Sequence, residues 1–336
     1  MENMHNRIKI RKIPAPSCKI CGSRGMQIYN GLQDSLFATP GTWNLDQCQN
    51  KECGLMWLNP MPLEEDIHNA YHAYYTHRDD QQKKSRIKQF INIILNHSLK
   101  LLLRLTPIYQ ERKDFNQMYL GGIKPGKLLC VGCGNGNRLV HLADMGWSVE
   151  GQEVDPICAD IAAKKGFNVH LGTLESLLLP DSSYDAIVMN HVIEHVHEPM
   201  KLLMECRRLL SPDGVLISIT PNTQSYGHRL FKYHWRGLEP PRHILLYCQQ
   251  CLTLLAKNSG FNNPIIWTTS ANAHHFAGDS LKIIYGNSTL NPFIKIILNI
   301  VSKLFLLMAR IIHALNKDSG EECVLMLRKE KQIVLS

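Results

Sequence analysis

The chain lacks several features that would place it in a specialised class of protein. Its first 15 residues include basic side chains but no apolar run of signal-peptide length, and no internal repeat or low-complexity tract is visible. We therefore expect a cytoplasmic protein whose 11 cysteines, an odd number, serve metal binding, catalysis or packing rather than disulfide bonds. With 336 residues and 44% hydrophobic content, the chain is long enough for one full α/β domain and a smaller unit.

The positive charge of the chain is concentrated in one window. The formal net charge is +8, and residues 83–113 contain eight basic side chains against one acidic side chain. Apolar residues recur at helical spacing over residues 86–105, which predicts a basic amphipathic helix. A second amphipathic helix is expected over residues 293–315, because its polar residues form one stripe along an apolar segment. Each helix could lie peripherally on the inner face of a membrane or pack against protein, and the sequence leaves both alternatives open.

Two cysteine pairs near the N-terminus predict a structural zinc site. Cys18 and Cys21 form a CxxC pair, Cys48 and Cys53 form a Cx4C pair, and a glycine follows each pair. Four thiolates from two tight turns complete a tetrahedral shell around Zn²⁺ and leave no coordination position for a substrate. We therefore expect a zinc ribbon over residues 14–62. The alternative is four unconnected thiols in a cytosolic protein.

The rest of the chain alternates short apolar strands with helices. Strands are expected at residues 128–131, 148–153, 168–172, 184–190, 215–220, 265–269 and 322–328, and helices at 138–145, 156–165, 199–210 and 249–259. This alternation predicts an α/β fold with a parallel, doubly wound Rossmann-like sheet. The expected organisation is a zinc ribbon at 14–62, a helical linker at 63–120, the sheet core at 121–280, an amphipathic helical insertion at 281–319 and the last strand of the core at 320–332.

Residue types suited to a nucleotide-like ligand follow four successive strands. The first strand ends in a glycine turn at residues 132–136, where backbone can pass close to a ligand. The second ends at Glu153, whose carboxylate can accept hydrogen bonds from two ribose hydroxyls. Ligands bind at the carboxyl ends of the strands in such sheets, so these side chains should meet at one edge. The expected cofactor contacts are Gly132, Gly134, Gly136, Glu153, Asp155, Thr173, Leu174, Asn190 and His191.

The order of these motifs resembles the class I S-adenosylmethionine-dependent methyltransferases of the ubiquinone-biosynthesis-like group. The resemblance covers about residues 128–261 and is carried by VGCGNG, GQEVDP, GTLESLLLPDSSYD, HVIEHVHEP and RRLLSPDGVLISITPN. It implies S-adenosylmethionine as cofactor and methyl transfer as the reaction. Many members have aspartate where this chain has Cys130, so recognition of the methionine end should rest more on backbone groups. A nicotinamide-dependent dehydrogenase is the alternative, disfavoured because the turn reads GxGxG rather than GxGxxG.

The N-terminal region carries a second resemblance. A zinc ribbon followed by CGLMWLNPMP and the pair Tyr74 and Tyr75 is similar to methyltransferases of polysaccharide and modified-sugar biosynthesis. This similarity implies a sugar, nucleotide-sugar or glycan acceptor, which is our leading expectation. Methylation of a quinone or other lipid is the alternative, encouraged by the two basic apolar segments. Ribosomal RNA is a further alternative, disfavoured because the positive window lies on an apolar helix. A methyltransferase-like subunit that only binds a partner is the non-enzymatic alternative.

The loop at residues 237–247 contains the expected catalytic residues. Methyl transfer is an in-line displacement, so the enzyme positions the acceptor and removes its proton. The loop resembles one that carries the catalytic base in related sugar and quinone methyltransferases, which implies that His243 is the base. Histidine titrates near neutral pH, whereas Arg242 could hold a phosphate or carboxylate, and Glu239 completes the expected catalytic set. The alternative is that His243 caps the helix that follows. The histidines of HVIEHV are expected to be structural.

Two motifs of other methyltransferases are missing. No Asn/Asp-Pro-Pro-aromatic motif follows the fourth strand, which disfavours methylation of amino groups on nucleobases or glutamine. The sequence also lacks the paired carboxylates expected of a catecholate metal site. The aromatic stretch of Phe231, Tyr233, His234 and Trp235 lies in the same loop region and is expected to form a wall of the acceptor site.

Overall fold

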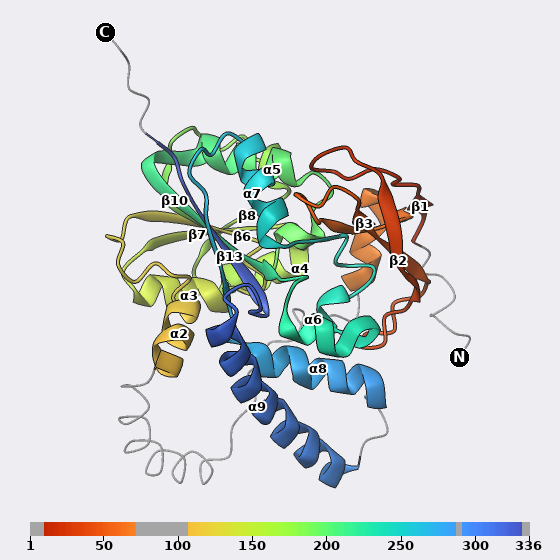
Figure 1. Cartoon of the computed structure of the whole chain (residues 1–336). Helices are drawn as coiled ribbons and strands as arrows, with labels where there is room; N and C mark the ends of the chain where they lie inside the picture. The colour runs from red at the N-terminus through yellow and green to blue at the C-terminus, as the bar shows by residue number, and fades with distance from the viewer. Residues whose placement is uncertain (1–9, 72–106, 287–290, 331–336) are drawn as a thin grey trace, which may run out of the picture.

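The computed structural model describes residues 10–71, 107–286 and 291–330, and it confirms the α/β class expected from the sequence (Figure 1). Within these residues, seven strands form the core sheet, a small β module lies beside it, and two long helices precede the last strand. The basic helix expected at 86–105 and the pair Tyr74 and Tyr75 lie outside the described residues.

The core sheet consists of the strands that the apolar alternation predicts. Its order is β12-β13-β10-β9-β6-β7-β8. Neighbouring strands from β10 to β8 are parallel, whereas β13 runs antiparallel to both β10 and β12. Chain order reverses between β6 and β9, and ligands of such sheets bind at this point, at the carboxyl ends of the strands. The bounds are Lys127–Val131 for β6, Ser148–Glu153 for β7, Asn168–Leu171 for β8, Tyr184–Asn190 for β9, Leu210–Pro221 for β10, Ile265–Thr269 for β12 and Glu322–Arg328 for β13.

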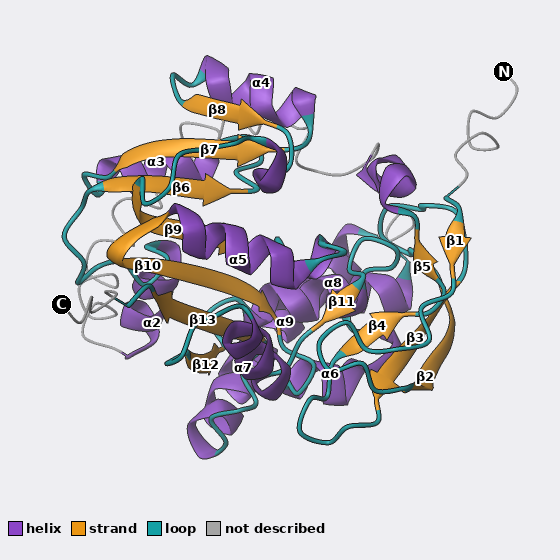
Figure 2. Cartoon of the chain, turned by 90° about the horizontal axis from the view of Figure 1, so that it is seen from above, coloured by secondary structure: helices purple, strands orange, loops and turns teal. Residues whose placement is uncertain are grey.

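Side chains of the sheet alternate between two apolar cores. Leu129 and Val131 of β6 belong to the core that α5 and α7 cover, whereas Leu128 and Cys130 belong to the core beneath α2 and α3. Figure 2 shows α5 and α7 in front of the strands and α3 behind them. Burial on both faces explains why the central strands β6, β9 and β13 are nearly continuous apolar runs. The helices are α2 at Pro107–Asn116, α3 at Asn137–Asp144, α4 at Pro156–Lys164, α5 at Pro199–Leu209 and α7 at Gln249–Asn258.

The N-terminal module is an antiparallel sheet that includes one strand from the core domain. Its order is β11-β4-β3-β2, and β11 (Leu245–Leu246) belongs to the loop expected to carry the catalytic base. The zinc ribbon expected over residues 14–62 thus shares a sheet with residues 245–246. The other elements are β1 at Lys12–Ile13, β2 at Gly25–Leu32, β3 at Trp43–Cys48, β4 at Met56–Leu58, β5 at Met61–Pro62 and the 3-10 helix η2 at Glu64–Tyr71.

Two helices, α8 (Ala273–Tyr285) and α9 (Pro292–Leu315), form a hairpin between β12 and β13. The helical insertion expected at 281–319 therefore begins earlier, at the start of α8. Small side chains of α8, including Ala277, contact Phe305 and Ala309 of α9. In Figure 1 the hairpin lies along one side of the core, and the N-terminal end of α9 projects beyond it.

Trp57→Ala tests whether the N-terminal module and the core fold as one unit. The Trp57 side chain is fully buried in the core shared with α5 and α7, and its Nε1 donates a hydrogen bond of 2.7 Å to the carbonyl oxygen of Ala15. We expect the substitution to lower the free energy of unfolding by about 3–5 kcal/mol and to shift the whole denaturation curve followed by circular dichroism.

Met26→Ala is the control, because Met26 lies on β2 of the same sheet and is 56% exposed. Its effect should stay within about 0.5 kcal/mol. An early, separate transition in Trp57→Ala, with the main transition unmoved, would show that the two parts fold independently.

Candidate active site

The glycine turn after β6 is held by a side chain of β7. Gln152 accepts a hydrogen bond from the N–H of Gly132 (3.2 Å) and donates one to the carbonyl oxygen of Gly172 (2.5 Å). It therefore ties the ends of β6 and β8 together. Gly132 has φ of +61°, and a Cβ there would lie 2.6 Å from the Val192 side chain. Gly134 has φ of +55° with no atom within 4 Å of a Cβ position, so its backbone is open to a ligand.

Glu153, at the carboxyl end of β7, orders the next part of the site. One carboxylate oxygen accepts the N–H of Gly134 (2.7 Å), and the other accepts two N–H groups of the following turn (2.8 and 3.1 Å). The remaining lone pairs can accept vicinal ribose hydroxyls. Asp155 lies beside it, but its Oδ1 caps α4 by accepting from two backbone N–H groups. Asp155 is therefore the cap of α4, and ribose recognition stays a prediction for Glu153.

The ends of β8 and β9 provide the other expected cofactor contacts. Leu174 is buried in a short helical turn that begins after Thr173, and it offers an apolar surface to an adenine ring. The Oδ1 atom of Asn190 is buried without a hydrogen-bond partner within the described part of the chain. An unpaired buried amide oxygen costs about 1–3 kcal/mol, so this position favours a ligand that donates a hydrogen bond. Together with the glycine turn and Glu153, these residues fit S-adenosylmethionine.

Cys130 contributes no charge to this site. Its side chain is 2% exposed and belongs to the core beneath α3, and burial raises the pKa of its thiol to about 12. The thiol is therefore uncharged at neutral pH, unlike the aspartate that the resembled family has at this position.

His191, at the same edge, forms ion pairs with two buried carboxylates. Its Nδ1–H donates to Glu194 (2.9 Å) and its Nε2–H donates to Glu322 of β13 (2.8 Å), and both carboxylate side chains are fully buried. Burial disfavours the charged ring, but these two hydrogen bonds outweigh it and raise the pKa of His191 to about 9. His191 is therefore an imidazolium at neutral pH and is unsuited to act as a general base.

His195 and His243 form a neutral pair of imidazoles. Their ring centroids are 4.8 Å apart. The Nδ1–H of His243 donates to the carbonyl oxygen of Gly237 (2.7 Å), and the Nδ1–H of His195 donates to that of Arg242 (2.9 Å). Each Nε2 therefore keeps a free lone pair. Burial, together with the nearby His195 and Arg236, lowers the pKa of His243 well below 6.5, so the ring has the protonation state of a base.

Glu239 lies beside the pair and could stabilise a positive charge on it. Its carboxylate forms ion pairs with Arg236 and Arg242, and one oxygen lies 3.5 Å from Nε2 of His243. The expected catalytic residues Glu239, Arg242 and His243 are thus brought together. The ligand atoms of Glu194, His195 and His243 also lie within 4.8 Å of one another, a group that could hold a divalent cation.

Arg242 is fully buried and joins three parts of the chain. Its Nε donates to Glu239 (2.7 Å), its Nη2 to Asp34 (2.9 Å), and its Nη1 to Thr39 (2.9 Å) and to the carbonyl oxygen of Ala70 (3.0 Å). These contacts connect the catalytic loop to the β2–β3 loop and to η2. We therefore assign Arg242 a positioning role, because its guanidinium faces protein acceptors rather than an open site.

The aromatic residues at positions 231–235 differ in their surroundings: one is buried near the site, and others lie at the surface. The Trp235 ring stacks on His228 (centroids 4.7 Å apart) and on Phe276 of α8 (6.0 Å). The Phe231 ring instead contacts α9, and Tyr233 is 40% exposed. His234 is exposed as well. A cavity of about 30 Å³ lies between Trp235 and the β2–β3 loop. Trp235 is therefore the one buried member of the stretch, and its role as a wall of the acceptor site stays a prediction.

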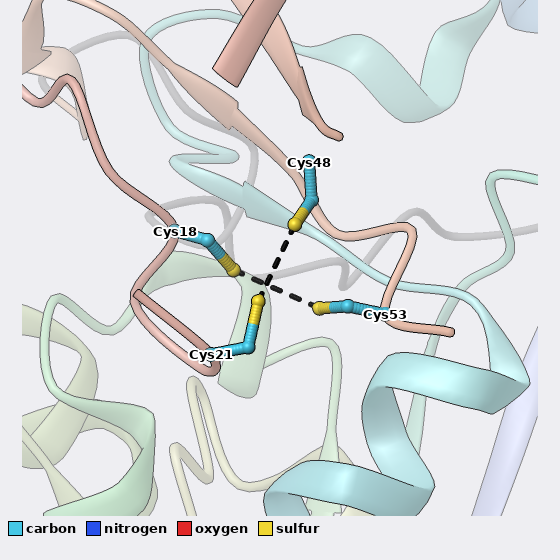
Figure 3. Close-up of side chains that lie close together, drawn as sticks. All are labelled: Cys18, Cys21, Cys48 and Cys53. Carbon is cyan, nitrogen blue, oxygen red and sulfur yellow. Dashed lines mark hydrogen bonds between the residues drawn. The ribbon is translucent and has the colours of Figure 1, made fainter. Parts of the chain in front are cut away.

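The four N-terminal cysteines point their sulfur atoms toward one centre (Figure 3). The Sγ atoms of Cys18 and Cys53 are 3.7 Å apart, and those of Cys21 and Cys48 are 3.4 Å apart. Four thiolates about 2.3 Å from a tetrahedral Zn²⁺ are separated by roughly 3.8 Å, so the arrangement fits that metal. The two cysteine pairs recognised in the sequence are thus brought together by the turns that precede β2 and follow β3.

Some residues of the site have little or no signal in the sequence. Glu322 and Gln152 are detectable, because Glu322 is the polar first residue of the apolar strand β13, and Gln152 is next to the predicted site residue Glu153 at the carboxyl end of β7. Asp34, Phe276 and Tyr71 are not, because each reaches the site from a distant segment. The Tyr71 hydroxyl, for example, lies 3.0 Å from Nδ1 of His195, across 124 positions of chain.

The sheet order, the glycine turn after β6 and the acidic residue after β7 are those of the class I S-adenosylmethionine-dependent methyltransferases. The chain belongs to this family, and a family model for the methyltransferase domain matches residues 107–264.

Two relatives are both named ubiquinone biosynthesis O-methyltransferase. The protein of Haemophilus ducreyi is 31% identical over 217 residues, which cover 56% of this chain and 91% of that protein. The protein of Actinobacillus pleuropneumoniae serotype 7 is 30% identical over 138 residues, which cover 38% of this chain and 58% of that protein. A solved S-adenosylmethionine-dependent methyltransferase of Thermotoga maritima is 20% identical and covers 71% of this chain and 100% of its own, with a TM-score of 0.45.

The charge of His191 predicts a pH dependence of stability. Its pKa of about 9 in the folded chain lies above the ordinary value of 6.5. The stabilisation is therefore complete below pH 6.5 and is lost as the pH rises through about 9. This shift corresponds to a free energy on the order of 3 kcal/mol.

Histidine NMR on ¹³C-labelled protein measures this pKa directly. The His191 ring should lose its proton near pH 9 in the folded protein and near pH 6.5 in concentrated urea. His191→Asn assigns the resonance by removing it. A His191 ring already neutral at pH 7 in the folded protein would contradict the charged assignment.

Proposed function

We propose that this methyltransferase transfers a methyl group to a hydroxyl oxygen of a quinol or related phenolic lipid. The observation that carries the proposal is the neutral His243 with a free Nε2, placed in a site whose apolar wall is Trp235 stacked on Phe276. A phenol ionises near pH 10, so an imidazole can take its proton as the oxygen is methylated. The names of the relatives, both ubiquinone biosynthesis O-methyltransferases, support the same class of acceptor.

Three residues of the loop have different roles in the proposed proton transfer. The glycine turn, Glu153 and Asn190 would hold S-adenosylmethionine, which when bound would supply a methyl group whose carbon–sulfur bond breaks as the acceptor oxygen is methylated. The Nε2 of His243 receives the hydroxyl proton, while its Nδ1–H stays on the carbonyl oxygen of Gly237. Glu239, 3.5 Å from Nε2, stabilises the imidazolium that forms. Arg242 holds the loop in place through Asp34.

A sugar, nucleotide sugar or glycan remains the acceptor that the N-terminal resemblance implies. The relatives' names favour the quinone alternative over it, and the apolar surroundings of Trp235 and Phe276 suit a hydrophobic acceptor. Ribosomal RNA would instead require basic side chains around the entrance to the site. A nucleotide sugar and RNA are therefore tested as acceptors alongside the phenolic lipid in the assay described below.

His243→Ala should abolish methylation and leave cofactor binding unchanged. Removal of a general base lowers turnover by roughly 10²- to 10⁴-fold, whereas none of the expected cofactor contacts is altered. Incorporation of labelled methyl into a prenylated catechol measures turnover, and isothermal titration calorimetry measures the affinity for S-adenosylmethionine. His234→Ala is the matched control, because this histidine is exposed in the same loop region.

Assays with different acceptors distinguish an error in the assigned base from an error in the assigned acceptor. Undiminished turnover in His243→Ala would overturn the assignment of the base. Methylation by the wild type of a nucleotide sugar or of RNA, with the prenylated catechol untouched, would overturn the acceptor class and leave the role of His243 open to the same test.

We also propose that Cys18, Cys21, Cys48 and Cys53 hold a structural Zn²⁺. Elemental analysis should find about one zinc per chain, and Cys48→Ser should lose it. The melting temperature and the turnover should both fall, because the zinc module shares β11 with the catalytic loop. Cys206→Ala, a buried cysteine of α5 outside the cluster, should keep its zinc. A chain that binds no zinc, or a Cys48→Ser variant with full activity, would contradict the proposal.

A further inference from the structure

Helix α9 carries an apolar face that no other described residue covers. The exposed side chains recur every three or four positions and are 43–68% exposed. They are Phe293, Ile297, Ile300, Leu304, Leu307 and Ile311. Exposed large side chains at Ile294, Val301 and Met308 widen this face beyond a narrow coiled-coil seam. A continuous apolar stripe of this size on a protein surface marks a site of interaction.

The opposite face of α9 fixes the helix to the enzyme. Ser302, Phe305 and Ala309 are buried against the neighbouring helices. The Phe305 ring stacks on Tyr226 with centroids 5.4 Å apart. The apolar face is therefore directed away from the protein along a helix of 24 residues, about 36 Å long.

The charges of α9 are of one sign. The helix contains Lys295, Lys303 and Arg310 but no aspartate or glutamate. Both lysines are exposed, whereas Arg310 lies 3.4 Å from Glu111 of α2. A second copy of α9 packed on this face would bring lysines together without an acidic partner. A layer with an apolar interior and a negatively charged surface complements both the apolar face of α9 and its two exposed lysines.

We propose that α9 lies in the interfacial layer of an anionic lipid membrane, with its apolar face inserted and its lysines at the headgroups. By length and composition, Phe293–Leu315 could also cross a bilayer. Crossing would require the helix to leave its contacts with α8 and to bury Lys295, Asn299 and Lys303 in lipid. Lying along the surface keeps the contacts of Phe305 and leaves those polar groups in water.

Helix α8 connects this surface to the active site. On one side, Phe276 stacks on Trp235, and Ser280 accepts a hydrogen bond of 2.9 Å from the N–H of Arg236. On another side, Ala277 packs against α9. A membrane-bound α9 would hold the acceptor site next to the bilayer, where a lipid-soluble substrate resides. This last step rests on the proposed function, whereas membrane binding itself does not.

Vesicle flotation tests the proposal with the full-length chain. Wild type should float with phosphatidylcholine vesicles that contain phosphatidylglycerol, and should float less with phosphatidylcholine alone or at high salt. Leu304→Asp should reduce the bound fraction at least about tenfold, because one large apolar contact is replaced by an anion. Lys295→Gln combined with Lys303→Gln should reduce binding to the anionic vesicles alone.

Leu178→Asp is the matched control, because Leu178 is 87% exposed outside α9 and should float like wild type. Unchanged melting temperature and unchanged turnover on a short-chain, water-soluble catechol show that Leu304→Asp is folded. A wild type that stays in the soluble fraction with anionic vesicles, or a Leu304→Asp variant that floats equally well, would overturn membrane binding. A wild-type dimer that Leu304→Asp converts to a monomer, without flotation of either, would assign the face to self-association. Flotation without methylation of any catechol would retain membrane binding and refute the proposed acceptor.

Discussion

The candidate active site is arranged around a buried guanidinium group, that of Arg242. Each N–H of a buried guanidinium needs a hydrogen-bond acceptor. Arg242 is completely buried, and its contacts reach Glu239 in its own loop, Asp34 in the N-terminal module and the carbonyl oxygen of Ala70 at the end of η2. Removal of one partner from such a cluster leaves an uncompensated charge, which costs about 3–5 kcal/mol. The contacts of Arg242 therefore fix the three segments relative to one another. They also position His243, the next residue in the chain.

Three histidines near Glu194 differ in charge, since His191 is positive whereas His195 and His243 are neutral, and their partners explain the difference. Two carboxylates, Glu194 and Glu322, hold the proton on His191, so this ring is a cation between the 3-10 helix at Ile193–His195 and strand β13. His195 and His243 meet backbone carbonyls and each other, so burial keeps both rings neutral. One edge of the sheet can thus carry both a permanent charge and a base.

The sequence predicts the parts of the fold that depend on local patterns. The core strands and helices lie within a few residues of their expected bounds, because strands buried on both faces are apolar runs bounded by turns. The cofactor edge follows from chain order, since successive strand ends meet there. The contact between Asp34 and Arg242 spans 208 positions and leaves no local trace. The beginning of α8 was also not predicted, because its first turns contain His274, His275 and Gly278, which are weak helix formers.

The pairing of Trp57 with Leu245 imposes an order on the synthesis of the chain. The second of these residues leaves the ribosome roughly 10 to 40 s after the first, at the usual rate of translation. Until then β4 is an open strand edge, and the thiols of Cys48 and Cys53, which precede β4 in the chain, belong to an unfinished sheet. A nascent chain with an exposed strand and free metal ligands is vulnerable to misassociation, so early capture of the metal would protect it while the ribosome completes the rest.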